Sequence, residues 1–336
     1  MNRLTLAAHT AYQDLLEAHG NRAVSDLRGK PFTKKISGKT YWYSRRRVGA
    51  EKVERYIGPD SDELRNRIEK MRDDLEEEKD FERRCAVLVA QLRAAGMPTL
   101  DRQTGSILNA MARVGVFRLG GTLIGTHAFR LYGAELGCKF PGFVAVTEDV
   151  DVAAFENLKL AIHDQVDPSL AETFGELSLQ PAPGLDPKGR PTRWTMKGGG
   201  TMVEFLAPRM QSKRDIVKLE PLSVYAQTLP FLNFLIADPI PAVALYRSGV
   251  LVQIPRPERY AIHKLIVAQR RSGSGLAKVA KDLAQAEALI EILLQDRPGE
   301  LALAYEAARD NGAKWREAVA ASMKQRPGIA KLLDQL

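Results

Sequence analysis

Hydrophobic and polar residues follow three different patterns along the first third of the chain. Over residues 1–28, apolar side chains recur at the spacing of an amphipathic helix: Leu4, Ala8, Tyr12, Leu15 and Leu16. Over residues 31–58, aromatic and β-branched residues alternate with basic ones around Gly38 and Gly49, which predicts a short antiparallel hairpin. Residues 64–92 return to helical spacing, and the polar stretch within them predicts a solvent-exposed helical connector.

The middle of the chain predicts a small mixed sheet. The expected elements, in order, are a helix at 103–113, a strand at 116–119, a glycine turn, a helix at 122–132, a strand at 147–153, a hairpin at 192–206, and strands at 242–246 and 251–254. The hairpin is expected to turn at the three consecutive glycines of residues 198–200.

From residue 257 onward, every segment has a helical pattern. Helices are expected at 257–271, 277–294, 299–310, 313–325 and 329–336. A small mixed sheet with a helical bundle behind it is an α+β arrangement, and 336 residues suffice for more than one domain. We therefore predict an N-terminal helical and basic β-hairpin appendage (residues 1–97), a core that carries the mixed sheet (98–256) and a C-terminal helical domain (257–336).

Composition excludes two broad classes of protein. With 45% hydrophobic and 27% charged residues, the chain is not expected to be disordered. Its most apolar stretch, residues 229–246, is interrupted by Asp238 and two prolines, so we expect no membrane span. Two cysteines, Cys85 and Cys138, cannot build a disulfide framework, and a reducing cytoplasm is the expected location.

Charge favours a polyanionic partner. The chain has 49 Lys and Arg against 41 Asp and Glu, a net charge of +8, and Lys and Arg release counterions when they meet phosphates. Within residues 31–58, three consecutive aromatic residues are followed by Arg45, Arg46 and Arg47. Such a segment suits stacking and phosphate contacts on RNA or tRNA. The same pattern also arises in a hairpin that buries its rings on one face and solvates its arginines on the other.

Three carboxylates are candidate metal ligands. Asp149 and Asp151 lie two positions apart in an expected strand, so their side chains point to the same face. Facing carboxylates repel each other unless a cation lies between them, and hard divalent cations prefer oxygen ligands. Glu204 follows in a later strand and faces opposite to its apolar neighbours. The alternatives are that the D-x-D pair lies in an ordinary surface loop and that Glu204 faces solvent.

Gly120, Gly121 and Thr122 form a candidate phosphate-binding turn. Two glycines that end a strand and open a helix leave backbone N–H groups at a helix N-terminus, where they can hold a phosphate. A lone Gly-Gly pair is more commonly a simple turn. The unusual feature is the order: strand, Gly-Gly-Thr, helix, acidic strand, and then a strand with a single inward acid.

This order resembles the nucleotidyltransferase superfamily with the DNA polymerase β-like fold. It is more closely similar to a bacterial group of nucleotidyltransferase-fold proteins with comparable GGTLIGTHAF and EDVD segments, over roughly residues 100–294. The resemblance implies that Asp149 and Asp151 hold one or two Mg²⁺ ions, that Glu204 completes the second metal site, and that the glycine turn positions the phosphates of an NTP such as ATP. The chain departs from the family pattern in having Thr122 in place of Ser and Glu204 in place of the commoner Asp.

Residues 257–283 resemble the later motifs of abortive-infection-type nucleotidyltransferase toxins. In those proteins a helix-borne lysine and a later Lys-Asp pair complete the pocket, and Lys264 matches the first while Lys281 and Asp282 match the second. The resemblance implies a cation beside the triphosphate, which would offset charge during phosphoryl transfer. The alternative is that Lys264 is one polar residue on an amphipathic helix.

Together, these resemblances imply Mg²⁺-dependent transfer of a nucleoside monophosphate from an NTP to an acceptor hydroxyl, with release of pyrophosphate. RNA, with tRNA as the first candidate, a protein side chain and a small molecule all remain open as acceptors, and a toxin-like role is among those implied. The alternative is a catalytically silent scaffold of the same fold that binds RNA or a protein partner. Because Asp149 and Asp151 are both present, the sequence favours the enzyme.

Overall fold

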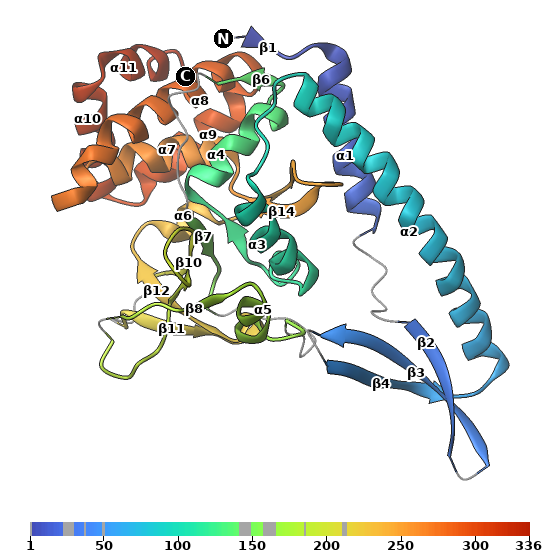
Figure 1. Cartoon of the computed structure of the whole chain (residues 1–336). Coiled ribbons are helices and arrows are strands. Elements are labelled where there is room, and N and C mark those ends of the chain that lie inside the picture. The colour runs from blue at the N-terminus through green and yellow to red at the C-terminus, as the bar shows by residue number, and fades with distance from the viewer. Residues whose placement is uncertain are drawn as a thin grey trace.

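The computed structural model has an α+β fold, as predicted (Figure 1). It describes residues 2–22, 30–36, 38–48, 51–140, 149–156, 166–184, 186–209 and 214–336. The helices of the C-terminal region gather at one end of the molecule, and the basic N-terminal strands lie at the other end of a long helix. Across the described residues, no helix combines the length and the hydrophobicity needed to cross a membrane.

Two helices pack together in the N-terminal part. Helix α1 (Leu6–Arg22) confirms the predicted amphipathic helix, because Tyr12 and Leu15 are fully buried; residues 1 and 23–28 of that prediction lie outside the described residues. Before it, strand β1 (Asn2–Arg3) pairs with β6 (Cys138–Lys139). Helix α1 packs against the predicted long helix, α2 (Asp62–Ala94), and both contribute to a second, smaller hydrophobic core that also includes Ala134 and Val243 of the central part.

The basic segment forms three strands rather than the expected two-stranded hairpin. Strands β2 (Lys30–Ile36), β3 (Lys39–Val48) and β4 (Glu51–Pro59) form an antiparallel sheet in that order. The difference arises because the middle run pairs on both sides, with β2 across the turn at Gly38 and with β4; residues 49–50 lie outside the described residues. Each of the three runs is long enough to pair along its length.

A seven-stranded mixed sheet forms the centre of the fold. Its strands are β5 (Thr122–Leu123), β7 (Val150–Ala153), β8 (Leu179–Pro181), β9 (Arg193–Met196), β10 (Met202–Pro208), β11 (Ile216–Leu219) and β12 (Val224–Leu229). Strand β10 is parallel to β7 and β12 and antiparallel to β9, so the predicted mixed sheet is confirmed. The β9–β10 hairpin turns at residues 198–200, as predicted. The acidic strand is confirmed over β7, which carries Asp151. Asp149, expected in the same strand, lies just before β7 and outside it, and residues 147–148 lie outside the described residues.

Helices cover this sheet and continue to the end of the chain. They are α3 (Arg102–Arg113), α4 (Gly125–Glu135), α5 (Leu170–Glu176), α6 (Leu232–Leu235), α7 (Pro257–Ala268), α8 (Val279–Asp296), α9 (Pro298–Asp310), α10 (Ala313–Gln325) and α11 (Pro327–Leu333). Short 3₁₀ turns occupy Glu220–Leu222 and Gly273–Lys278. Strands β13 (Ile240–Ala244) and β14 (Val250–Ile254) form a separate antiparallel pair. The predicted C-terminal helices and the predicted β13–β14 pair are therefore confirmed.

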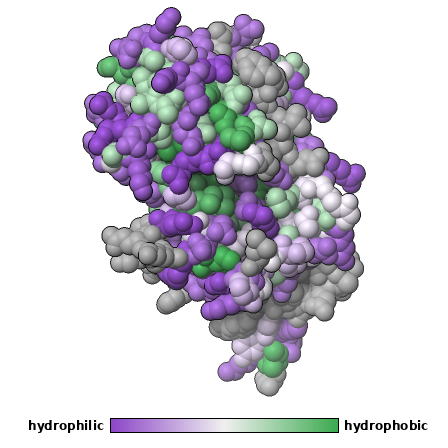
Figure 2. Space-filling model, turned by 90° about the vertical axis from the view of Figure 1, so that its left-hand side faces the viewer, coloured by the Kyte–Doolittle hydropathy of each residue, from purple (hydrophilic) through white to green (hydrophobic). Residues whose placement is uncertain are grey.

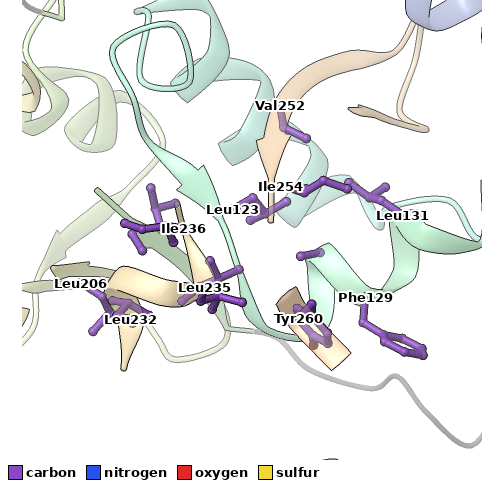
Figure 3. Close-up of a cluster of buried hydrophobic side chains, with 14 of the residues drawn as sticks. Leu123, Phe129, Leu131, Leu206, Leu232, Leu235, Ile236, Val252, Ile254 and Tyr260 are labelled. Carbon is purple, nitrogen blue, oxygen red and sulfur yellow. The ribbon is translucent and has the colours of Figure 1, made fainter. Parts of the chain in front are cut away.

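One hydrophobic core joins the mixed sheet to the C-terminal helices. Figure 3 shows Leu123 of β5 within it, among side chains from α4, α6, β14 and α7: Leu131, Leu235, Ile236, Val252, Ile254 and Tyr260. Apolar burial therefore runs across the predicted boundary at residues 256/257, and the three-part division of the chain stays a prediction. On the face shown in Figure 2, hydrophilic residues cover most of the described surface and hydrophobic ones form small groups.

Candidate active site

Two of the predicted acids lie side by side on neighbouring strands. Strands β7 and β10 are parallel, and their register pairs Asp151 directly with Glu204. Directly opposed residues of adjacent strands project to the same face of a sheet. Burial, together with the charges of Glu204 and Asp149, raises the pKa of Asp151 to about 7. The structure therefore brings the three acids near enough to repel one another, as the D-x-D spacing predicts.

This set of carboxylates fits a divalent cation. A buried carboxylate whose neighbours are also acidic is stabilised in its charged form by a bound cation, and oxygen donors suit Mg²⁺. In the described part of the chain, no three His, Cys, Asp or Glu side chains are already gathered as a metal site. Glu204 instead accepts a hydrogen bond from Arg193 Nε of β9 at 2.8 Å. Its role as the third ligand stays a prediction.

The N-terminus of helix α4 lies directly against Asp151. The Ile124 N–H donates to the backbone oxygen of Asp151 at 2.9 Å. Gly125 has a φ of +68°, and a Cβ on it would lie 2.6 Å from Asp151 Oδ2, so only glycine fits here. Ile124, the residue that precedes the helix, makes no side-chain capping hydrogen bond. An uncapped helix N-terminus attracts anions through its exposed N–H groups and its dipole.

The predicted glycine turn is placed differently from expectation. Residues 116–119 form a turn rather than a strand, and Gly120 and Gly121 lead into β5 rather than into a helix, so that part of the prediction is wrong. Their N–H groups already donate to Phe117 O and Val116 O. Thr122 is buried on β5, where it pairs with Ala153 of β7. The helix begins later than predicted because residues 122–123 form strand β5, which pairs with β7, and α4 therefore starts at Gly125.

Sequence reasoning missed Gly125 and Thr126 as the pair that opens the helix. The segment GGTLIGT contains two glycine–threonine pairs, and their spacing alone does not show which one precedes a helix. The only local signal was the short apolar run before Gly125, which is consistent with a buried strand.

The predicted C-terminal residues converge on this same helix end. Lys281 Nζ lies 3.0 Å from Thr126 Oγ1. Lys264 Nζ donates to Asp282 Oδ1 at 2.6 Å, and Arg271 Nε donates to Asp282 Oδ2 at 2.9 Å. The structure thus brings Lys264, Lys281 and Asp282 together, and it places Lys281 on Thr126 at the start of α4, while the charge of Lys264 acts on Asp151.

The two lysines differ in their surroundings. Lys264 is buried, and its ammonium group lies 5.1 Å from the centre of the Tyr260 ring as well as against Asp282. Burial lowers the pKa of Lys264, and Asp282 opposes that change. Lys281 is partly exposed, and burial lowers its pKa too. Of the two, Lys281 is therefore the better placed to reach a bound anion.

Tyr260 ties the C-terminal helices to the start of α4. Its hydroxyl donates to Gly125 O at 2.9 Å and lies 3.2 Å from Gln285 Oε1 of α8. Tyr260 is also part of the hydrophobic core, where it meets Tyr132 and Phe129 of α4. Packing and hydrogen bonding therefore hold α4, α7 and α8 in one arrangement around the carboxylates.

Comparison with known proteins agrees with this geometry. A family model described as nucleotidyltransferase matches residues 102–310, more than half of the chain. The chain therefore belongs to this nucleotidyltransferase family, which confirms the prediction of a nucleotidyltransferase and supports transferase activity; the resemblance to a bacterial group stays a prediction. A second model, described only as a domain of unknown function, matches residues 11–66. The likeness to abortive-infection toxins still rests on residues 257–283 alone.

Two further comparisons are less informative. No curated protein sequence matches the chain. A solved structure, that of an antigenic nucleotidyltransferase-like protein from Paracoccidioides brasiliensis, is similar with 15% sequence identity over 70% of this chain and 94% of that one. Its TM-score is 0.38, so it adds nothing to the description of the site.

Proposed function

We propose that this protein is a metal-dependent nucleotidyltransferase that moves a nucleoside monophosphate from an NTP to an acceptor hydroxyl. The observation that carries the proposal is the contact between the start of helix α4 and the acidic strand, with Gly125 against Asp151. It joins a candidate phosphate-binding helix end to a candidate metal site. Lys281, on Thr126 Oγ1, adds a cation at the same place.

The triphosphate would bind at the N-terminus of α4. The N–H groups of the first turn, the Thr126 hydroxyl and the Lys281 ammonium group are three kinds of donor that suit phosphate oxygens. This assigns to Gly125 and Thr126 the role predicted for Gly120, Gly121 and Thr122. The latter three would act indirectly, because they form the turn and the strand that set the start of α4 beside β7.

Asp149 and Asp151 would hold Mg²⁺, with Glu204 as the third ligand. When bound, Mg²⁺ would neutralise phosphate charge and lower the pKa of the acceptor hydroxyl. In the reaction, the acceptor oxygen bonds to the α-phosphorus and the bond to the β-phosphate breaks, releasing pyrophosphate. Glu204 would orient the acceptor, and the exposed Arg193 of β9, which donates to its carboxylate, supports a position at the edge of the site.

Lys264 would act by positioning its neighbours. Its buried ion pair with Asp282 links α7 to α8, and Asp282 directly follows Lys281 in the chain. Arg271 completes the neutralisation of Asp282. The cation that contacts phosphate would then be Lys281, with Lys264 and Asp282 holding it beside Thr126.

Binding of an Mg²⁺–NTP complex tests this proposal. In thermal shift measurements with ATP and the other NTPs plus Mg²⁺, at least one nucleotide should raise the melting temperature of the wild-type protein, because ligands that bind only the folded state stabilise it. Asp151→Asn should lose that shift. Asp215→Asn, which removes an exposed carboxylate near β11, is the matched control and should keep it. Equal shifts in both variants would contradict the proposal, and the silent-scaffold alternative would regain support.

A further inference from the structure

The three-stranded basic sheet has two chemically different faces. Its register pairs Phe32 with Tyr43 and Lys34 with Tyr41, and Arg45 lies two residues beyond Tyr43 on the same strand, so these residues share one face. We call the face defined by Phe32, Lys34, Tyr41, Tyr43 and Arg45 the aromatic–cation face. Thr33 pairs with Trp42, and Lys35 pairs with Thr40, which places these four residues on the opposite face.

Rings and cations interleave on the aromatic–cation face. The Phe32 and Tyr43 rings lie 5.9 Å apart. Arg45 Cζ lies 4.1 Å from the centre of the Phe32 ring, and Lys34 Nζ lies 5.1 Å from that of Tyr43. The three rings are half-buried, while Lys34 and Arg45 are exposed. This face therefore presents cations and ring surfaces together, rather than a closed apolar layer.

On the opposite face, Trp42 links the sheet to the start of helix α2. Trp42 Nε1 donates to Asp60 Oδ1 at 2.7 Å, and Arg65 Nε of α2 donates to the same oxygen at 2.9 Å. The Asp60 N–H also donates to Thr40 O. This link fixes the sheet to the start of α2, at the far end of that helix from the C-terminal helices (Figure 1).

Charge concentrates in this sheet. Residues 30–59 contain nine Lys and Arg against two Glu, a net charge of +7 in a chain whose total is +8. A protein partner would favour an interface centre depleted of charge. Cations interleaved with aromatic rings instead match a strand in which phosphates alternate with bases, because the cations meet phosphates and the rings stack on bases.

We propose that the aromatic–cation face binds single-stranded RNA. The strand must be single because a duplex hides the faces of its bases. We commit to RNA because it offers a hydroxyl on every nucleotide, which suits a nucleotidyl acceptor. The choice of RNA over single-stranded DNA, and the role of this RNA as acceptor, rest on the proposed function, whereas the binding of a single strand to this face does not.

Lys34 and Lys35 provide a matched pair for the test. They are adjacent, both are exposed, and each loses one positive charge on substitution by Ala, but they lie on opposite faces. Binding of a fluorescently labelled, unstructured U-rich RNA of about 12 nucleotides, a length within the range of single-strand sites, is followed by anisotropy with the full chain. No NTP or Mg²⁺ is present.

Lys34→Ala should weaken binding several-fold and reduce the slope of log K against log salt by about 0.7, the value for one single-strand phosphate contact. Lys35→Ala should change both quantities by less than half as much. Equal effects of the two variants would overturn the assignment of the face. No detectable binding at low salt would overturn the proposal as a whole.

Stacking is tested at Tyr43. Tyr43→Leu should weaken binding at least about fivefold, the lower limit for losing one base–aromatic stack, while Tyr43→Phe keeps the ring and should bind as the wild type does. Loss of binding in Tyr43→Phe as well as in Tyr43→Leu would show that the ring does not stack. The same RNA sequence as a duplex, and as single-stranded DNA, should bind more weakly; equal or tighter binding of either would contradict the choice of single-stranded RNA.

A variant of the carboxylate site separates this proposal from the proposed function. Asp151→Asn should keep the wild-type RNA affinity, because the carboxylate lies outside the basic sheet. If Asp151→Asn binds RNA normally while wild-type protein transfers no nucleotide, the RNA-binding face stands and the enzyme proposal fails. If the protein transfers a nucleotide to RNA but Lys34→Ala and Lys35→Ala weaken RNA binding equally, the enzyme proposal stands and the assignment of RNA binding to this face is wrong.

Discussion

Gly125 and Asp151 approach each other so closely that a Cβ on Gly125 would lie 2.6 Å from Asp151 Oδ2. The contact joins the first residue of α4 to the acidic strand β7. It leaves no room for a side chain, and the φ of +68° at Gly125 disfavours one independently. A carboxylate and the positive end of a helix dipole are thereby placed within reach of one ligand.

Gly125→Ala should therefore impair both folding and function. The left-handed backbone alone costs about 1–2 kcal/mol for a non-glycine residue, and the added methyl group must displace the Asp151 carboxylate. We expect a lower melting temperature and loss of Mg²⁺–NTP binding. Gly299→Ala, in helix α9 with no atom near the added carbon, is the control; it should keep nucleotide binding and should not lower the melting temperature, because Ala favours a helix over Gly. Normal nucleotide binding by Gly125→Ala would show that the contact does not matter.

Substitution of Lys281 should affect NTP binding, whereas substitution of Lys264, a positioning residue, should affect stability. Lys281→Ala should raise the KM for the NTP about tenfold, as expected for the loss of one charged phosphate contact, with little change in melting temperature. Lys264→Ala should lower stability by about 3 kcal/mol, because it leaves the buried Asp282 with Arg271 as its only cation among the described contacts. Melting curves and initial rates are measured on both variants. A raised KM in Lys264→Ala together with a loss of stability in Lys281→Ala would contradict these assignments.

Glu204 should matter more for turnover than for nucleotide binding. If it orients the acceptor, Glu204→Gln should slow single-turnover transfer while the affinity for Mg²⁺–NTP stays near that of the wild type. Arg193→Ala, which removes the hydrogen-bond donor to Glu204 but keeps the carboxylate, is the control and should retain nucleotide affinity. A collapse of NTP affinity in Glu204→Gln, with normal turnover of bound NTP, would assign Glu204 to nucleotide binding instead.

His127 should make the protein sensitive to acid. It is buried on α4, and no protein partner contacts either ring nitrogen within the described residues. Burial, with Arg130 and Lys281 nearby and Asp101 opposing them, lowers the pKa of His127 to about 4. Since an unfolded histidine titrates near pH 6.5, the unfolded state takes up a proton first, and stability falls as the pH drops from about 6.5 to 4.

The expected loss from His127 alone is about 3 kcal/mol by pH 4. Denaturant unfolding between pH 4 and 8 measures it, and His127→Gln should reduce the acid-side slope. His9→Gln, on the partly exposed face of α1, is the control and should keep the slope. An unchanged slope in His127→Gln would mean that this ring is already protonated, or is solvated, in the folded protein.

The grouping of the candidate acids agrees with the structure, whereas the element that follows the glycine turn was predicted wrongly. Asp149, Asp151 and Glu204 could be grouped because strand geometry fixes the side of every second residue. The choice between the two glycine–threonine pairs could not be made, because it depends on β5 pairing with β7, a contact between segments distant in the chain. The burial of Lys264 was hidden for a similar reason: α7 is enclosed by α8, α9 and α10 on faces that its own sequence leaves polar.

In the rest of the fold as well, elements that depend on local sequence were predicted correctly, and elements that depend on contacts between distant segments were not. Helices α9 and α10 lie within a residue or so of their predicted bounds, because their spacing and proline or glycine boundaries are local. The third strand of the basic sheet was missed because β4 alternates less regularly, and it is completed by pairing with β3. Trp42 gave no sequence signal of its contact with Asp60, which the return of the chain into α2 creates.

The most direct test of the account is to follow the position of the transferred phosphate. The full chain is incubated with Mg²⁺ and an NTP labelled either at the α- or at the γ-phosphate, together with total cellular RNA and lysate proteins as acceptors. The account predicts that α-label enters an acceptor, that γ-label appears only in pyrophosphate, and that Asp151→Asn abolishes both while Asp215→Asn does not. Incorporation of γ-label, or undiminished incorporation of α-label by Asp151→Asn, would contradict it.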